Sequence, residues 1–274
     1  MTYATLLVNL VAGSPNRCVL NAAGELARLF GSRVIGIIGC EPVPIMMGDG
    51  IVGGQIIVDF RTELDRQILE TEAEFRKALE SDKIAYEWRS NTHGYPLTVY
   101  VANEARCADL LIATAVPREL FHSTEHVGLG DFIMRAGRPV LVVPHSGTKF
   151  PLNRIVIAWK DSRESRRAVR DALPLLKAAN DVTVVEISPK ETTSLALNRI
   201  TDVTTWLERH GVKATPLVVP ATGDDAHDLD AFLEKQSADL VVAGAYGHSR
   251  LREWAFGGVT DGILRNGRCA LLSH

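Results

Sequence analysis

A glycine-rich segment late in the chain, AGAYGHSRLREWAFGGVT at 243–260, has the residue types of an anion-binding site. It follows Leu240, Val241 and Val242, which are typical of a buried strand, and it leads into an amphipathic helical pattern. Glycine lets the backbone approach an anion, and the start of a helix offers free amide groups and a positive dipole end. The segment therefore predicts a phosphate site of the kind that holds a nucleotide.

The same glycines also suit tight turns and close packing of a helix on a strand, and glycine alone does not decide between these roles. His248 and Ser249 in this segment either face a phosphate or cap the following helix. Both interpretations stay open at the level of sequence.

A long internal repeat organises the rest of the chain. ADLLIATAVP at 108–117 aligns with ADLVVAGAYG at 238–247, and GDFIMRAGRPVLVV at 130–143 aligns at the same offset with TDGILRNGRCALLS at 260–273. The alignment needs no gap between these two blocks. A repeat this long indicates two copies of one domain and is too long for a solenoid unit.

The repeat and a turn-rich linker near 145–153 predict two domains, 1–146 and 152–274. Strand and helix patterns alternate in each, with five strands and four crossover helices, so we expect two tandem doubly wound α/β domains with parallel sheets. We expect Asp59–Glu80 and Arg163–Ala178 to be helices. The glycine- and proline-rich insert between Glu41 and about Phe60 is expected to be a loop.

Composition narrows the classes of function. The 274 residues are 46% hydrophobic and 23% charged, with a net charge of −3 and no basic stripe, so we expect no nucleic-acid partner. No apolar run approaches the roughly 18 residues of a membrane span, so no membrane partner is expected either. The four cysteines form no CxxC pair, and the N-terminus lacks a basic leader, so we expect a cytoplasmic protein.

Several enzyme classes lack their motifs in this chain. Neither GxxxxGK[ST] nor GxSxG occurs, and the first-strand loops lack the SGGxDS pattern of a related α/β nucleotide-hydrolysing fold. His122 and His126 have metal-ligand spacing only on a helix, and we expect a solvated loop there. We therefore expect no catalytic residue and no resident metal, and at most slow, metal-assisted ATP hydrolysis.

The spacing Gly244-x2-Gly247-x9-Gly257, followed by a small residue, resembles the nucleotide-binding signature G-x2-G-x9-G-(S/T) of the universal stress protein family. The flanking strand, the GGVTDGILR helix pattern and the final RCALLS strand are similar as well. The resemblance implies the strand order 3-2-1-4-5, ATP binding in many members, pairing of domains through their last strands, and a role in stress survival and regulation.

The resemblance implies a nucleotide site at the carboxyl ends of the second domain's strands. Its expected members are Gly244, Gly247, His248, Ser249, Gly257, Gly258, Val259, Thr260, Trp159, Lys160 and Asp161. Gly258 replaces the signature's hydroxyl residue, although its amide and Thr260 remain. Lys160 stands where ATP-binding members commonly have aspartate; it cannot accept a hydrogen bond from ribose, but it can pair with phosphate. Asp161 is next to it. Trp159 either stacks on a base or lies in the core.

The first half departs from the signature. Thr114 and Pro117 replace the leading glycines, and Val127 and Gly128 stand at the later positions. Proline has no amide hydrogen to donate, so we expect this half to be a structural partner without its own nucleotide.

Two hypotheses follow for function. The first is a stress-response regulatory protein whose second domain binds ATP or a related nucleotide, with or without Mg²⁺. The second is a scaffold that binds no nucleotide and acts through protein contacts. The aliphatic last strands, Val140–Val143 and Ala270–Leu272, pair either within one chain as a pseudo-dimer or between two chains as a homodimer.

Overall fold

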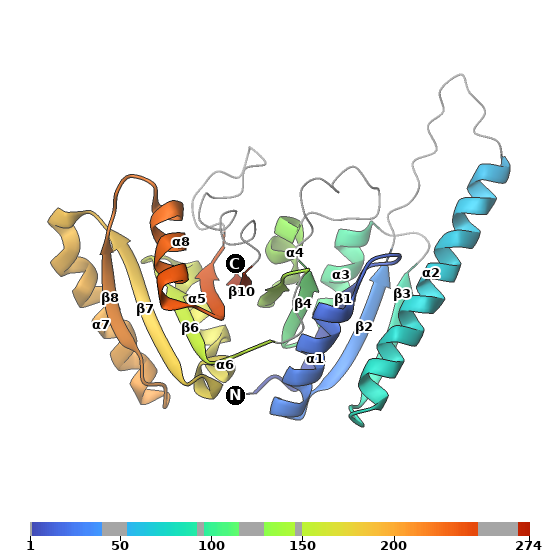
Figure 1. The fold of residues 1–274 in the computed structure, drawn as a ribbon, viewed down its shortest axis with the longest axis horizontal. Helices are drawn as coiled ribbons and strands as arrows, with labels where there is room; N and C mark the ends of the chain where they lie inside the picture. Colours follow the sequence, from blue (N-terminus) through green and yellow to red (C-terminus); the bar gives the residue numbers. More distant parts are fainter. Residues whose placement is uncertain (1, 40–53, 92–95, 115–128, 146–149, 246–267) are drawn as a thin grey trace, which may run out of the picture.

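The strands of the two halves join into one ten-stranded sheet with the order β3-β2-β1-β4-β5-β10-β9-β6-β7-β8 (Figure 1). The computed structural model describes residues 2–39, 54–91, 96–114, 129–145, 150–245 and 268–274. The first half supplies β1 (Thr5–Leu10), β2 (Arg33–Gly39), β3 (Tyr86–Asn91), β4 (Leu110–Thr114) and β5 (Val140–Val143). The second supplies β6 (Arg154–Ala158), β7 (Asp181–Ser188), β8 (Thr215–Pro220), β9 (Leu240–Gly244) and β10 (Cys269–Ser273).

Each half has the order 3-2-1-4-5 in its own numbering, as expected, and every strand pair within a half is parallel. The two halves meet through β5 and β10, which run antiparallel with Ala270 opposite Val142 and Leu272 opposite Val140. The last strands therefore pair within the chain, which answers the question that the sequence left open.

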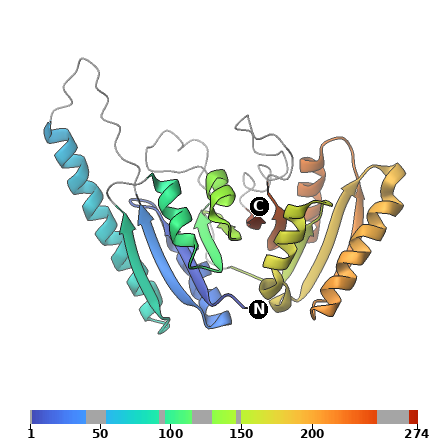
Figure 2. The same cartoon turned by 180° about the vertical axis from the view of Figure 1, so that it is seen from behind.

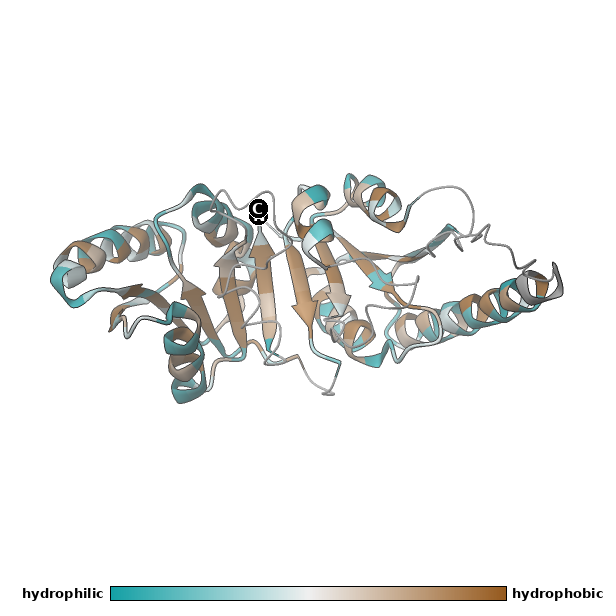
Figure 3. Cartoon of the chain, turned by 90° about the horizontal axis from the view of Figure 1, so that it is seen from above, coloured by the Kyte–Doolittle hydropathy of each residue, from teal (hydrophilic) through white to brown (hydrophobic). Residues whose placement is uncertain are grey.

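Helices cover both faces of this sheet, which explains why central strands such as β4 and β5 are apolar runs without alternation (Figure 3). One face carries α1 (Arg17–Phe30), α2 (Gly54–Glu80), α5 (Arg163–Asp171), α6 (Leu173–Ala178) and α7 (Thr193–Arg209). The other carries α3 (Leu97–Ala105), α4 (Leu129–Ala136) and α8 (Asp225–Gln236), and a short 3-10 turn, η2 (Lys190–Thr192), precedes α7. None of the described helices is both long and apolar enough to cross a membrane.

A repeated aspartate shows the equivalence of the two halves at atomic level. Asp109, just before β4, accepts hydrogen bonds from the backbone N–H groups of Ala4 and Thr5 at 2.8 and 2.9 Å. Asp239, just before β9, accepts from Asn153 and Arg154 at 3.0 and 2.9 Å. Each carboxylate thus fixes the start of the first strand of its own half, in the two positions that the sequence repeat aligns.

Two expected elements differ from the structure. Helix α2 begins at Gly54, not at Asp59, so the last part of the expected loop insert is helical. The insert's glycines and prolines all precede Gln55, and the residues after it have no helix breaker. The expected helix Arg163–Ala178 is two helices that meet at Ala172, because Pro174 in the first turn of α6 cannot donate a backbone hydrogen bond to the preceding turn.

The paired aspartates predict matched losses of stability. Replacing Asp239 with Ala removes the acceptor of two backbone N–H groups, so we expect the free energy of unfolding to fall by about 1–3 kcal/mol. Asp109→Ala is expected to cost a similar amount, and Asp239→Asn less, because the amide retains one acceptor oxygen. Urea unfolding followed by circular dichroism measures all three. An Asp239→Ala variant as stable as the parent would show that these bonds do not hold the strand.

Candidate functional site

The carboxyl ends of β6 and β9 lie side by side in the middle of the second half. These two strands are parallel neighbours, with Ile155 opposite Leu240 and Ala158 opposite Ala243. From β6 the chain proceeds to β7 on one side, whereas β9 and β10 lie on the other. This is the topological switch point of the half-sheet, the position at which α/β folds bind ligands.

The structure brings together four of the expected site residues at this point. Trp159, Lys160 and Asp161 directly follow β6, and Gly244 ends β9. The other seven expected residues lie outside the described part of the chain, so their role stays a prediction: Gly247, His248, Ser249, Gly257, Gly258, Val259 and Thr260.

Gly244 allows the start of α5 to pack directly on β9. A Cβ atom at this position would lie 2.5 Å from the backbone nitrogen of Ser165 and 2.6 Å from the carbonyl carbon of Glu164. No side chain fits at that distance from backbone atoms. This glycine therefore has a packing role, which is one of the two roles that the sequence allowed.

Trp159 belongs to the core. Its side chain is only 9% exposed and lies in the apolar cluster on the α5 and α7 side of the sheet. Its backbone N–H donates to the carbonyl of Val185 on β7 at 2.8 Å, so that carbonyl is engaged within the sheet. Burial favours the core role of Trp159 over stacking on a base.

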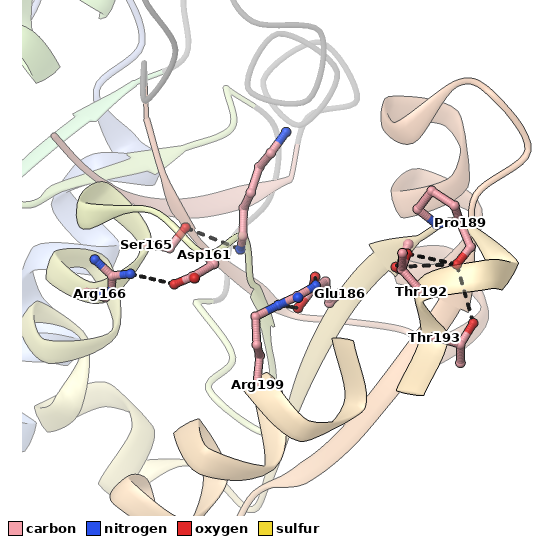
Figure 4. A network of polar contacts seen from close by, with 10 residues as sticks. Asp161, Ser165, Arg166, Glu186, Pro189, Thr192, Thr193 and Arg199 are labelled. Atoms are coloured by element: carbon pink, nitrogen blue, oxygen red, sulfur yellow. Dashed lines mark hydrogen bonds and ion pairs between the residues drawn. The ribbon is translucent and has the colours of Figure 1, made fainter. Parts of the chain in front are cut away.

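Lys160 and Asp161 are exposed on the loop between β6 and α5. Figure 4 shows Asp161 beside Arg166. The backbone N–H of Lys160 points toward Ser165 Oγ at 3.4 Å, and Asp161 forms an ion pair of 2.5 Å with Arg166. Ser162 caps α5, since its hydroxyl accepts from the Ser165 N–H at 3.2 Å. The cap and the ion pair fix the loop that presents the Lys160 side chain.

Glu164 is a buried carboxylate in the first turn of α5 that sequence reasoning missed. Its side chain is 2% exposed and forms an ion pair with the outward-facing Arg163. Burial raises the pKa of Glu164, but hydrogen bonds from Arg163, from its own backbone N–H and from Ser162 outweigh burial and lower it. The negative charge also suits the positive end of the helix dipole.

Glu186 and Arg199 form a second ion pair that the sequence did not reveal (Figure 4). Glu186 lies buried near the carboxyl end of β7, and Arg199 reaches it from α7, with Nε at 3.3 Å. Alternate β7 residues from Val182 to Ser188 are buried, which puts Glu186 among inward-facing positions. A charged residue at such a period-2 position is the signal that could have identified the pair.

Past β7, hydroxyl groups stabilise the turn into α7. Ser188 Oγ lies 2.8 Å from Thr192 Oγ1, and the carbonyl of Pro189 accepts from the hydroxyls of Thr192 and Thr193 at 3.2 and 3.5 Å (Figure 4). These contacts keep the loop beyond β7 folded back on the start of α7.

The equivalent end of β1 in the first half is filled by side chains of its own chain. Asn16 is buried and bonds to both the N–H and the carbonyl of Val11 at 3.0 Å. Gly13 has φ of +67°, and Gln67 Oε1 of α2 lies 2.7 Å from the place of a Cβ there. Thr114, the counterpart of Gly244, is buried. These contacts agree with a structural role for this half; Pro117, Val127 and Gly128 lie outside the described residues.

Metal-ligating side chains do not gather in the described part of the chain, where no group of three or more His, Cys, Asp or Glu could hold an ion. The HSTEH segment with His122 and His126 lies outside the described residues.

Comparisons with known proteins identify the family of the second half. Residues 151–272 match the model of the Universal stress protein family. The crystal structure of a universal stress protein from Archaeoglobus fulgidus covers 98% of this chain and 95% of its own, with 13% identity and a TM-score of 0.72. A functionally unknown protein from Pseudomonas aeruginosa covers 99% and 92%, with 14% identity and a TM-score of 0.61. No curated protein sequence matches. The whole chain therefore shares the fold of these two structures.

The packing at Gly244 predicts that Gly244→Ala destabilises the protein. The added methyl group meets backbone atoms of α5 that cannot rotate away, so we expect a loss of about 1–3 kcal/mol in the free energy of unfolding. Gly24→Ala on α1 is the matched control, because the nearest atom to its added Cβ is the mobile Arg28 Nη1 at 3.7 Å. That variant should be neutral or more stable by up to about 1 kcal/mol. Equal stability of the two variants in urea would contradict the packing role.

The lowered pKa of Glu164 predicts a stability contribution that depends on pH. The folded state favours the ionised carboxylate, so its contribution is present above the ordinary pKa of 4.5 and is lost as the pH falls through the lower folded value. We expect Glu164→Gln to be less stable than the parent at neutral pH, and the difference to shrink below about pH 4. Urea unfolding at both pH values measures it, with the exposed Glu191→Gln as control. A difference that stays constant with pH would contradict the assignment.

Proposed function

The second half of this chain, residues 151–272, belongs to the universal stress protein family, and from this we propose that it binds an adenine nucleotide, with ATP as the first candidate. The regulatory role that we propose with it is in the stress response, in the cytoplasm. The observation that carries the proposal is the position of the glycine segment: it begins at Gly244, at the switch point, beside the loop that presents Lys160.

Lys160 supports the phosphate end of such a ligand. It is exposed and forms no ion pair with any residue that the structure describes, whereas Asp161 next to it is held by Arg166. An ammonium group on the loop after β6, next to the carboxyl end of β9, can pair with a phosphate that the glycine amides also contact. Mg²⁺, where it enters with ATP, would offset further charge of the triphosphate.

The ribose of such a ligand has few hydrogen-bond acceptors at this edge, because Lys160 stands where an aspartate could accept from its hydroxyl groups. Asp161 and Glu186, two of the carboxylates at this edge, each accept from an arginine. A ribose hydroxyl would have to compete with a guanidinium for either of them. We therefore propose that affinity for the ligand comes mainly from its phosphates, and that the nucleoside alone binds weakly.

A scaffold without nucleotide is the second candidate, and two observations favour it. Gly244 has a packing role that needs no ligand, and Trp159 is part of the core. In this case the chain would act through protein contacts, as a monomer with two equivalent halves or as a homodimer.

Calorimetric titration with ATP and Mg²⁺ decides between the two candidates. We expect ATP to bind the parent protein, and Lys160→Gln to weaken it about fivefold or more through loss of one phosphate contact. The control is Lys190→Gln, an exposed lysine on η2 with the same change in charge. Adenosine should bind weakly and without dependence on Lys160.

Absence of binding at millimolar ATP, with the protein folded, would exclude the nucleotide hypothesis and favour the scaffold. Gly247→Val tests the glycine segment itself, since a side chain there should obstruct the approach of phosphate to the backbone. Normal ATP binding by this variant would show that the nucleotide lies elsewhere.

A further inference from the structure

A cleft of about 370 Å³ opens between the start of α5 and the carboxyl end of β10, lined by Arg163, Arg167 and His274. Its volume is at the lower end of the range for small-molecule sites. The two arginines are four residues apart on α5 and so lie on one face of that helix. Figure 2 shows α5 beside the end of the chain, where β10 stops.

Arg163 is held by the carboxylate of its neighbour, Glu164. Its guanidinium pairs through Nε with the buried carboxylate of Glu164, while 82% of its side chain is exposed. A guanidinium carries five N–H donors in a plane, so one contact with Glu164 leaves further donors for a ligand in the cleft that Arg163 lines. The buried carboxylate therefore orients Arg163 rather than covering it.

Arg167 and His274 connect the cleft to the ends of β9 and β10. Arg167 donates through Nη1 to the main-chain oxygen of His274, which holds the arginine at the carboxyl end of β10. His274 Nδ1 lies 3.1 Å from the carbonyl oxygen of Ala245, and that oxygen can only accept, so Nδ1 is the protonated nitrogen. The backbone N–H of Ala245 in turn donates to the backbone carbonyl of Ser273 at 2.8 Å.

The described side chains that line the cleft are two arginines and a histidine. Asp171 lies at the far end of α5, where Arg167, Arg170 and Arg138 act on it electrostatically. Its carboxylate accepts from Ser273 Oγ at 2.9 Å, and partial burial raises its pKa.

We propose that this cleft is a binding site for phosphate groups, in which the guanidiniums of Arg163 and Arg167 contact the phosphate oxygens. Guanidinium forks match the geometry of phosphate oxygens, and two of them on adjacent turns suit a chain of at least two phosphates. The ligand is either free polyphosphate or the distal phosphates of a nucleotide held at Gly244 and beyond. Only the nucleotide form rests on the function proposed above.

Calorimetry with tripolyphosphate and, separately, with ATP tests this site on the full chain. We expect the double variant Arg163→Gln/Arg167→Gln to lose at least tenfold in affinity for one or both ligands. The control is Arg209→Gln/Lys213→Gln, which removes the same charge from two exposed positions, one at the end of α7 and one just after it. This control should change affinity less than twofold. Urea unfolding checks that both double variants are as stable as the parent.

Each outcome has a distinct meaning. Loss of tripolyphosphate binding identifies a site for free polyphosphate, even if ATP does not bind and the proposed function fails. Loss confined to ATP identifies the site with the distal phosphates of a nucleotide. Unchanged affinities in the Arg163→Gln/Arg167→Gln variant, equal losses in the control, or no binding of either ligand by the parent would overturn the proposal.

Discussion

The antiparallel pairing of β5 with β10 is the interaction on which the rest of this architecture depends. Each half-sheet alone would end in an aliphatic strand with a row of unpaired backbone N–H and C=O groups. Pairing Val142 with Ala270 and Val140 with Leu272 satisfies those groups and continues one sheet across both halves. The apolar clusters on its two faces therefore also run across the junction, with members from both halves in each.

Within this common frame the two halves treat the carboxyl ends of their strands differently. In the second half Gly244 lets the backbone of α5 approach β9 closely, so that Glu164 becomes buried and Arg163 and Lys160 stand at the edge. In the first half Thr114 has a side chain at the matching position, and Asn16 bonds to the loop after β1. The difference between Gly244 and Thr114 thus accompanies different contacts at the two edges: close packing of α5 on β9 in the second half, and side-chain contacts of Asn16 with the loop after β1 in the first.

Sequence reasoning predicted the sheet well because the repeat fixes it twice. The ADLL and ADLV blocks align two aspartates that make the same backbone contacts in both halves. The strand order was implied by the resemblance to the universal stress protein family, and the sheet has it in each half. It placed Lys160 and Gly244 together because parallel strands end at the same edge. It missed Glu164 and Glu186 because both acquire partners only through tertiary packing. Helix α2 begins before the expected Asp59 because the glycines and prolines of the insert lie only in its first part, up to Gly54.

Charge pairing at this edge gives the strongest argument about the chemistry of its ligand. Every carboxylate described there has an arginine: Asp161 has Arg166, Glu164 has Arg163, and Glu186 has Arg199. These pairs are close to neutral in sum, so the remaining charge comes from groups without a carboxylate partner among the described residues. Lys160 is such a group, exposed on the loop before α5. A cation beside a helix N-terminus favours an anion such as a phosphate.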